Sequence, residues 1–156
     1  MITNFEDFIN ENKIEPYKYT KYENVIYSFN STGKKDILKV IEFQKIENEY
    51  NLAFGDALYD NENNIIGYDD TSMSDNGDFD KIISTLVTII YDFSKIFKNY
   101  IQFTGSSDKR TKIYNYLIKR YYDIFVIDFE IYGIINDNIE MFDTNKNYDI
   151  IKIKRK

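Results

Sequence analysis

The arrangement of apolar and polar residues predicts three strands in the first part of the chain. Residues 24–29, 36–46 and 50–56 alternate between apolar and polar positions in the manner of half-buried strands, and short polar turns separate them. Antiparallel hairpins are therefore expected. The apolar phase slips near Val40, which predicts a β-bulge in the second of these strands.

Two helical segments are expected after these strands. Apolar residues recur at helical spacing from Phe79 to Phe97, and Asp78 is placed to cap this helix. Residues 100–105 predict a strand, after which a second helix begins with Ser106 or Ser107 as its cap.

The remaining segments complete the predicted sheet. Residues 124–134 alternate between apolar and polar positions and are expected to form a strand, and residues 148–154 form the last one. The Asn- and Asp-rich loop over residues 59–78 is long for a compact domain, which is typical of functional loops. A brief strand is expected inside it at Ile65–Tyr68.

The predicted order is helix, three antiparallel strands, helix, strand, helix and two strands. A strand–helix–strand crossover needs a mixed sheet, so the expected fold is α/β (α+β), a mainly antiparallel sheet with packed helices. This order is similar to the core of the GNAT acetyltransferase fold, an analogy of topology only. Residues 16–156 are expected to form one domain, preceded by a short amphipathic helix within residues 1–15.

Composition excludes several classes of chemistry. The sequence contains no histidine and no cysteine, so it offers no imidazole base, no thiolate nucleophile and no ordinary zinc site. No cofactor is expected. No apolar run approaches the roughly 20 residues that a membrane helix needs, and no signal peptide is visible. A cytoplasmic protein without a membrane partner is therefore expected.

Charge is unevenly distributed along the chain. The net charge of −6 argues against nucleic acid as a partner. Residues 48–80 contain acidic residues and no lysine or arginine, whereas residues 95–122 contain one acid, Asp108, among several basic residues. The acidic stretch is expected to present a surface to a basic partner protein.

Arg110 is the charged residue that the second helix places on its apolar side. At 100° per residue, Tyr114, Leu117 and Tyr121 lie within about 40° of Arg110. The lysines of the same helix fall away from this stripe. A guanidinium that points inward needs a partner, because an unpaired buried charge is costly.

Two interpretations of Arg110 follow. Asp56 shares a strand face with Leu52 and Phe54, and it is expected near Gly105 at one edge of the sheet, where it can form a structural ion pair with Arg110. Alternatively, Arg110 and the turn at Gly105, Ser106 and Ser107 bind a small anionic ligand, since turn amides and helix N-termini bind anions. This turn is neither a Walker loop nor a Rossmann fingerprint.

The long loop carries four aspartates with two possible roles. These residues are Asp69, Asp70, Asp75 and Asp78. Carboxylates are ligands for Mg²⁺ or Ca²⁺, but their spacing fits no EF-hand, and a solvated acidic loop explains them without a metal. The GNAT analogy would place cofactor pyrophosphate at residues 72–81, which contain one glycine and three aspartates, and these carboxylates would repel an anion. Acetyl-CoA chemistry is therefore disfavoured.

Several separated motifs resemble a family of small bacterial proteins that is known only as a domain of unknown function. The motifs are "YNLAFGD", "DNGDFDKIISTL", "IQFTGSSDKRTKIY", "FEIYG" and "KNYDIIKIKRK". The family pattern marks Gly55, Asp56, Asn76, Gly77, Asp78, Gly105, Ser106, Arg110 and Tyr114. Because no activity is attached to this family, the resemblance implies a site without implying a reaction.

The first residues have a separate resemblance. "MITNFEDFINE" is similar to the N-terminal targeting peptides of internal head proteins of large tailed phages, and Ile9–Glu11 matches their hydrophobic-x-Glu cleavage site. The alternative is a plain amphipathic helix. The phage interpretation implies a factor that acts on a host defence or regulatory protein.

A non-catalytic binding protein is the function that these observations favour. Its partner is expected to be a protein or a small anionic ligand, bound by Gly105, Ser106, Ser107, Arg110, Tyr114 and Asp56. The rival function is a GNAT-like transferase with an altered donor site. If the protein is an enzyme, we expect a cavity at the strand ends lined by Tyr68, Tyr114 or Asp56. If it is a binding module, we expect an exposed patch near the acidic loop instead.

Overall fold

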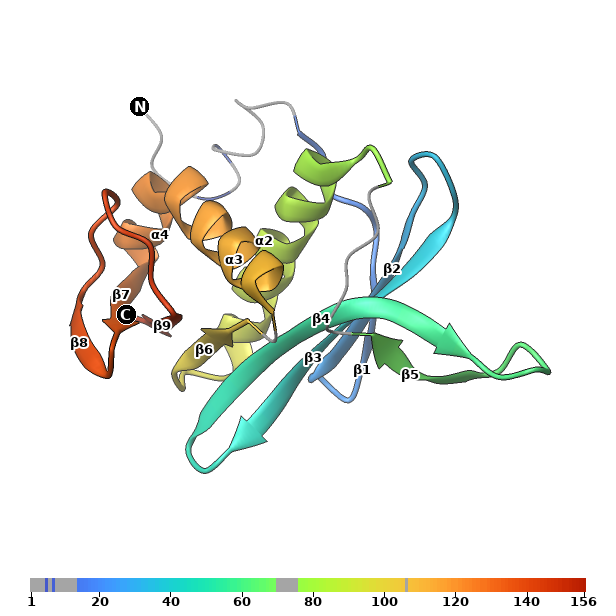
Figure 1. Ribbon diagram of the computed structural model, residues 1–156, viewed down its shortest axis with the longest axis horizontal. Coiled ribbons are helices and arrows are strands. Elements are labelled where there is room, and N and C mark those ends of the chain that lie inside the picture. Colours follow the sequence, from blue (N-terminus) through green and yellow to red (C-terminus); the bar gives the residue numbers. More distant parts are fainter. Residues whose placement is uncertain (1–4, 6, 8–13, 70–75, 106) are drawn as a thin grey trace.

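The computed structural model describes residues 5, 7, 14–69, 76–105 and 107–156. Within these residues the fold is α+β, with nine strands in one mixed, mostly antiparallel sheet and three helices (Figure 1). Most of the predicted N-terminal segment lies outside the described residues, as do Asp70, Asp75 and Ser106. No helix in the described part of the chain is long and apolar enough to cross a membrane.

The elements follow one another in the order in which the sequence analysis expects most of them. They are β1 (Thr20–Tyr22), β2 (Ile26–Ser31), β3 (Ile37–Ile46), β4 (Glu49–Tyr59), β5 (Ile65–Asp69), α2 (Phe79–Ile96), β6 (Ile101–Thr104), α3 (Asp108–Arg120), α4 (Tyr122–Asp128), β7 (Phe129–Ile135), β8 (Asn138–Met141) and β9 (Ile150–Arg155). The brief strand predicted inside the long loop is confirmed as β5. Of the two predicted N-cap residues of α3, Ser107 takes that position.

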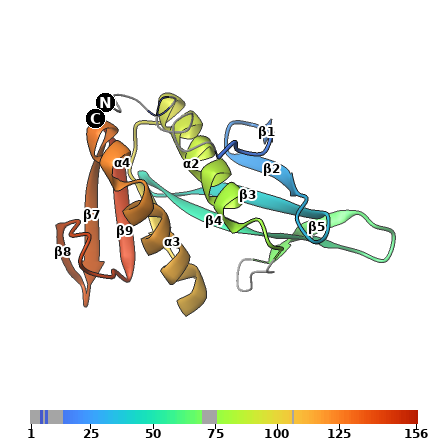
Figure 2. The same cartoon turned by 90° about the horizontal axis from the view of Figure 1, so that it is seen from above.

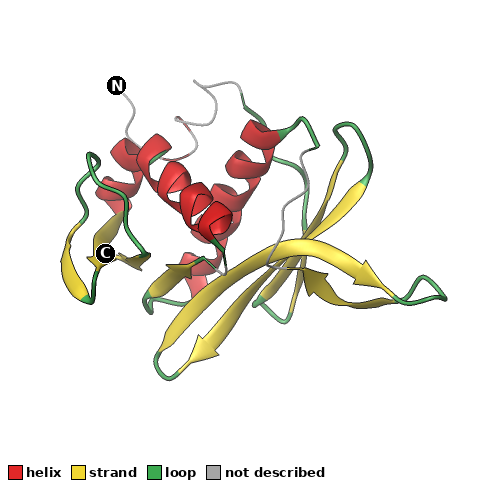
Figure 3. Cartoon of the chain, viewed as in Figure 1, coloured by secondary structure: helices red, strands yellow, loops and turns green. Residues whose placement is uncertain are grey.

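The strand order is β1-β2-β3-β4-β6-β9-β7-β8, and β5 also pairs with β4. The pair β4–β6 is parallel, and each of the other ladders is antiparallel. The predicted crossover is thereby confirmed, because β5 and α2 connect β4 to its parallel neighbour β6. The helices pack against one face of the sheet (Figure 3).

Two predictions about local structure are wrong. Strand β3 has no bulge near Val40: its register with both neighbours runs without interruption, and Val40 simply lies on the face away from the helices. Residues 124–134 do not form one strand, because Tyr122–Asp128 is the helix α4. Phe125 is fully buried there and Ile127 is 47% exposed, whereas a strand would place these two residues on the same face.

Aromatic rings fill much of the core between the sheet and α2. Phe93 of α2 stacks on Phe43 of β3 with ring centroids 3.7 Å apart, and it meets Tyr50 edge to face at 5.0 Å. Phe97 stacks on the other side of Phe93 at 4.8 Å. This cluster ties α2 to the neighbouring strands β3 and β4.

One hairpin extends beyond this core. The end of β4 and the strand β5 pair from Ala57 opposite Tyr68 outward, and Figure 1 shows them projecting from the body of the molecule. We call residues 57–68 the arm. The hydrophobic core of the described residues includes none of its side chains.

Buried tyrosines make the fold sensitive to alkaline pH. Burial, with the nearby Asp92 carboxylate, raises the pKa of Tyr19 to about 12, and the same two causes raise the pKa of Tyr27. Burial and a hydrogen bond to Asp128 raise the pKa of Tyr91. These phenols stay protonated when folded but ionise near pH 10.0 when unfolded. These three phenols should therefore have no effect on the pH dependence of the free energy of unfolding well below about pH 10. As the pH rises from about 10 towards 12, their ionisation in the unfolded state should lower that free energy.

The measurement is the urea midpoint of the wild type and of Tyr91→Phe across this alkaline range. Tyr91→Phe removes one ionisable phenol but keeps the ring, so its midpoint should fall less steeply with pH. Tyr22→Phe is the matched control, because Tyr22 is 52% exposed and should leave the slope unchanged. Equal slopes for all three proteins would contradict the linkage.

Candidate functional site

One edge of β4 is shared by two strands. β6 pairs with it at Tyr50 and Asn51, and β5 pairs with it from Asp56 onward. Lys39 of β3 also lies opposite Asp56, so β5 must occupy the edge away from β3, on the side of β6. Residues 52–55 of β4 lie between these two pairings. Among the described residues, no strand pairs with residues 52–55 along this edge. The helix α3 reaches this region through Arg110, which contacts Phe54.

Two cationic side chains converge on the ring of Phe54. The guanidinium carbon of Arg110 lies 4.8 Å from the ring centroid, and Nζ of Lys39 lies 6.0 Å from it. Arg110 is 1% exposed and Lys39 is fully buried. The face of an aromatic ring attracts cations, particularly where water is excluded. The prediction that Arg110 points into the core is confirmed, and Lys39 joins it there.

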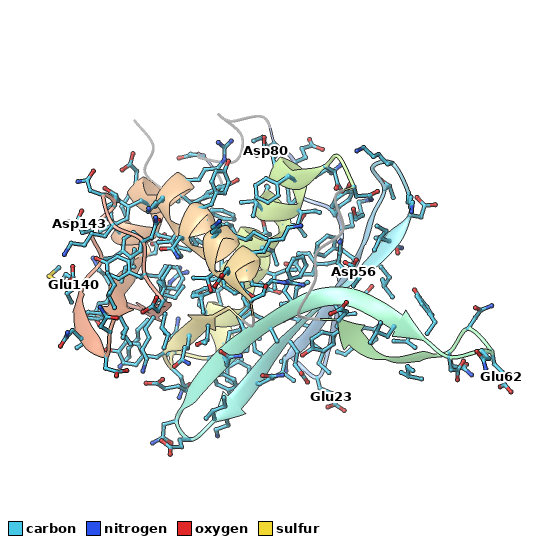
Figure 4. The ribbon with its side chains drawn as sticks, in the orientation of Figure 1. Glu23, Asp56, Glu62, Asp80, Glu140 and Asp143 are labelled. Atoms are coloured by element: carbon cyan, nitrogen blue, oxygen red, sulfur yellow. The ribbon has the colours of Figure 1, made fainter. Side chains whose placement is uncertain are left out.

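The structure gives Asp56 a different cation from the one expected. Its carboxylate forms an ion pair with Lys39, directly opposite in the β3–β4 ladder. The guanidinium of Arg110 instead donates a hydrogen bond to the backbone carbonyl of Asp69, with 3.3 Å between Nη2 and the oxygen. Figure 4 shows Asp56 on β4 near the base of the arm. Asp56 therefore neutralises Lys39, and its side chain is still 26% exposed.

The turn before α3 is shaped by packing and capping. A Cβ atom at Gly105 would lie 2.2 Å from Oγ1 of Thr111, so only glycine allows the first turn of α3 to approach this closely. The Ser107 hydroxyl accepts a hydrogen bond from the backbone N–H of Arg110 at 3.3 Å, which makes it the N-cap. The same turn thus fixes the position from which Arg110 enters the core.

Tyr114 lies on the buried side of α3. It is 4% exposed, and its ring centroid is 5.5 Å from that of Phe103 of β6. Tyr114 therefore packs α3 onto the sheet one turn after Arg110.

Asp78 does not project from an acidic surface. It is the residue before α2, but its side chain makes no capping hydrogen bond. One carboxylate oxygen, Oδ2, accepts hydrogen bonds from the hydroxyls of Tyr17 and Ser31, each at 2.5 Å. Asp78 therefore joins the N-terminal segment and β2 to the start of α2.

Asn76 holds the β2–β3 turn next to this carboxylate. Its side-chain nitrogen donates to Oγ of Ser31 and to the carbonyl of Lys35, both at 2.8 Å, and its side-chain oxygen accepts from the N–H of Lys35 at 2.8 Å. The backbone oxygen of Asn76 would lie 1.8 Å from a Cβ at Gly33. We call Tyr17, Ser31, Asn76 and Asp78, with the 33–35 turn, the Asn76 latch.

The roles of the two residues that define these arrangements, Lys39 and Asn76, were not predicted from the sequence. Lys39 was not considered, although it shares a strand face with Ile41 and Phe43, so its buried position follows from the period of two. Asn76 was marked only by the family pattern, since a buried amide in a polar loop leaves no periodic signal. The described residues contain no cluster of three or more acidic side chains that could hold a metal ion.

A comparison with protein families now identifies the chain. A model described as a family of unknown function, DUF6934, matches residues 13–156. The chain belongs to DUF6934. The matched range spans every strand and helix given above, so the Asn76 latch and the Lys39–Arg110 pair both lie within the DUF6934 domain. No curated protein and no solved structure matches the sequence.

Proposed function

We propose that this DUF6934 protein is a non-catalytic binding protein that recognises an anionic group at the Lys39–Arg110 site. The observation that carries the proposal is the convergence of two buried cations on one ring, Phe54, beside a carboxylate that remains 26% exposed. A carboxylate or phosphate of a small ligand has the charge and the acceptor atoms that a guanidinium and an ammonium bind.

The electrostatics of the site favour an anion. The N-terminus of α3 points its backbone amides towards the start of the helix, and Arg110 lies in that first turn. An anion that contacts both cations would be attracted strongly, because opposite charges interact more strongly in a region shielded from water. Asp56 is the internal anion that a ligand would supplement or displace.

The residues around the site favour binding over catalysis. The sequence has no histidine and no cysteine, and the carboxylate of Asp56 is paired with the ammonium of Lys39. The arm supplies the exposed patch that a binding module predicts, since Leu58, Ile65 and Ile66 on it are at least 45% exposed. Both observations support a role in recognition.

Ligand-dependent stabilisation tests the proposal. A thermal-shift panel of inorganic phosphate, nucleotides, phosphosugars and dicarboxylates should contain an anion that raises the melting temperature. At 100 times its Kd, that ligand adds about 2.7 kcal/mol of stability, a shift of roughly 5 to 10 °C for a chain of this size. Lys39→Met keeps the length of the side chain but removes its charge, so this variant should lose the shift. Lys98→Met, an exposed lysine, should keep it.

A second variant keeps the test decisive if Lys39→Met fails to fold. Arg110→Lys preserves the charge but not the planar guanidinium, so it should fold and bind the same ligand about tenfold more weakly. Two results would overturn the proposal: no anion stabilises the wild type, or Lys39→Met and Arg110→Lys respond to the anion as the wild type does. In either case the two cations are structural.

A further inference from the structure

The arm exposes apolar side chains that the rest of the fold does not cover. Leu58, Tyr59, Ile65 and Ile66 are exposed by 45%, 50%, 55% and 67%. They lie on neighbouring strands of one hairpin, which projects from the body of the molecule (Figure 1). Exposed apolar residues gathered in this way mark an interaction site, whereas single exposed residues do not.

The tip of the arm is ordered by its own hydrogen bonds. Oδ1 of Asp60 accepts from the backbone N–H of Glu62 and of Asn64, each at 2.9 Å. The backbone of Asp60 also pairs with Asn64 and Asn63. A hairpin that is already rigid loses little conformational freedom on binding, which favours its use as a docking element.

The charge of the arm specifies the kind of surface it fits. Residues 48–80 contain no lysine or arginine, so each charged side chain of the arm is acidic. Figure 4 shows Glu62 at its tip. Two arms brought together would repel each other. An apolar surface bordered by basic residues complements both the exposed apolar side chains and the negative charge of the arm.

The same chain carries such a surface on α3. Lys109, Lys112, Tyr116 and Arg120 are exposed at helical spacing along one side of this helix. The ring of Tyr116 lies 5.3 Å from that of Phe79, and these rings are 39% and 40% exposed. We call Phe79, Lys109, Lys112, Tyr116 and Arg120 the α3 face. Two acids lie near it: Asp80 beside Arg120, and Asp108 one turn before Lys112 on α3. Figure 2 shows α3 at the margin of the molecule, away from β1 and β2.

We propose that two copies of this chain associate by docking the arm of each on the α3 face of the other. The contact pairs apolar arm residues with Phe79 and Tyr116, and it pairs Glu62 with the basic residues of α3. Because each copy offers both surfaces, two reciprocal contacts close a two-fold dimer. This association does not depend on the Lys39–Arg110 site, since Lys39 and Arg110 are buried and the α3 face is exposed.

Sedimentation velocity on the full chain tests the dimer. The wild type should dimerise with a Kd in the micromolar range, and added salt should weaken it. Glu62→Lys and Lys112→Glu each place like charges at both contacts, so each variant alone should weaken dimerisation at least about tenfold. Glu130→Lys, on β7 at the end of the molecule opposite the arm, should leave the wild-type Kd unchanged.

An equimolar mixture of the two weakened variants gives the decisive result. In a mixed dimer, the Glu62→Lys arm meets the Lys112→Glu face, and the other contact pairs a native arm with a native face. The mixture should therefore restore dimers that neither variant forms alone. Ile66→Ser should also weaken the dimer while Ile139→Ser, an exposed isoleucine on β8, should not. A monomeric wild type, a larger open assembly, or a mixture without dimers would overturn the proposal.

Discussion

Replacing Phe93 with alanine should reduce the free energy of unfolding by about 4 kcal/mol, the largest effect we expect from a single core substitution. Phe93 is fully buried and is stacked between Phe43 and Phe97, with Tyr50 against its edge. The substitution opens a cavity that these rings cannot fill without leaving their positions. It also removes the aromatic contacts that join α2 to β3 and β4.

Equilibrium unfolding in urea measures this effect, and α2 offers a matched control. Ile96, three residues further along the same helix, is 48% exposed, so Ile96→Ala should change stability by less than about 1 kcal/mol. If Phe93→Ala cost no more than Ile96→Ala, the aromatic cluster would not be the centre of the core.

Asn76→Ala should destabilise the protein by about 3 kcal/mol, although it removes only a small polar side chain. The side chain of Asn76 is 2% exposed and hydrogen bonds to the hydroxyl of Ser31 and to both backbone groups of Lys35. Alanine leaves these buried groups without a hydrogen-bond partner, because its methyl group can neither donate nor accept a hydrogen bond. The loss should appear as a lower urea midpoint with an unchanged slope.

A second substitution separates hydrogen bonding from volume at the same position. Asn76→Asp keeps the size of the side chain but replaces the donor with an acceptor that faces the carbonyl of Lys35 and lies near Asp78. It should therefore be no more stable than Asn76→Ala. Asn145→Ala, at an exposed asparagine, is the control and should be neutral. An Asn76→Asp protein as stable as the wild type would mean that the Asn76 latch only fills space.

The parts of the fold predicted correctly are those with a strong periodic signal. Eighteen residues of α2 repeat at helical spacing, and the buried side of α3 follows from the wheel that centres on Arg110. Short segments carry too few residues to define a period. Residues 124–128, which belong to α4, were therefore predicted as the start of a strand. Asn138–Met141, with Ile139 and Met141 both exposed, gave no signal of the edge strand β8.

The misassigned partner of Asp56 has a different cause. The two-residue turn between β3 and β4 pairs Ile46 with Glu49, and counting back along the ladder places Lys39 opposite Asp56. The hairpin was predicted with a three-residue turn at 47–49, so its expected register did not place Lys39 opposite Asp56. The wheel of α3 showed that Arg110 points inward, but it does not show which residue on the sheet lies opposite. Only the three-dimensional arrangement shows that the guanidinium of Arg110 lies against the ring of Phe54 and donates to the carbonyl of Asp69.

The separation of acidic residues on the arm from basic residues on α3 gives these two elements together an electric dipole. The negative end lies towards the arm, with Asp60 and Glu62, and the positive side follows the exposed lysines of α3. Such a dipole turns an approaching charged molecule before any surfaces touch, so it affects how fast partners meet and in which orientation. For two copies of this chain, antiparallel dipoles bring each arm towards the other's α3. Salt would then slow their encounter more than it shortens the life of the pair once formed.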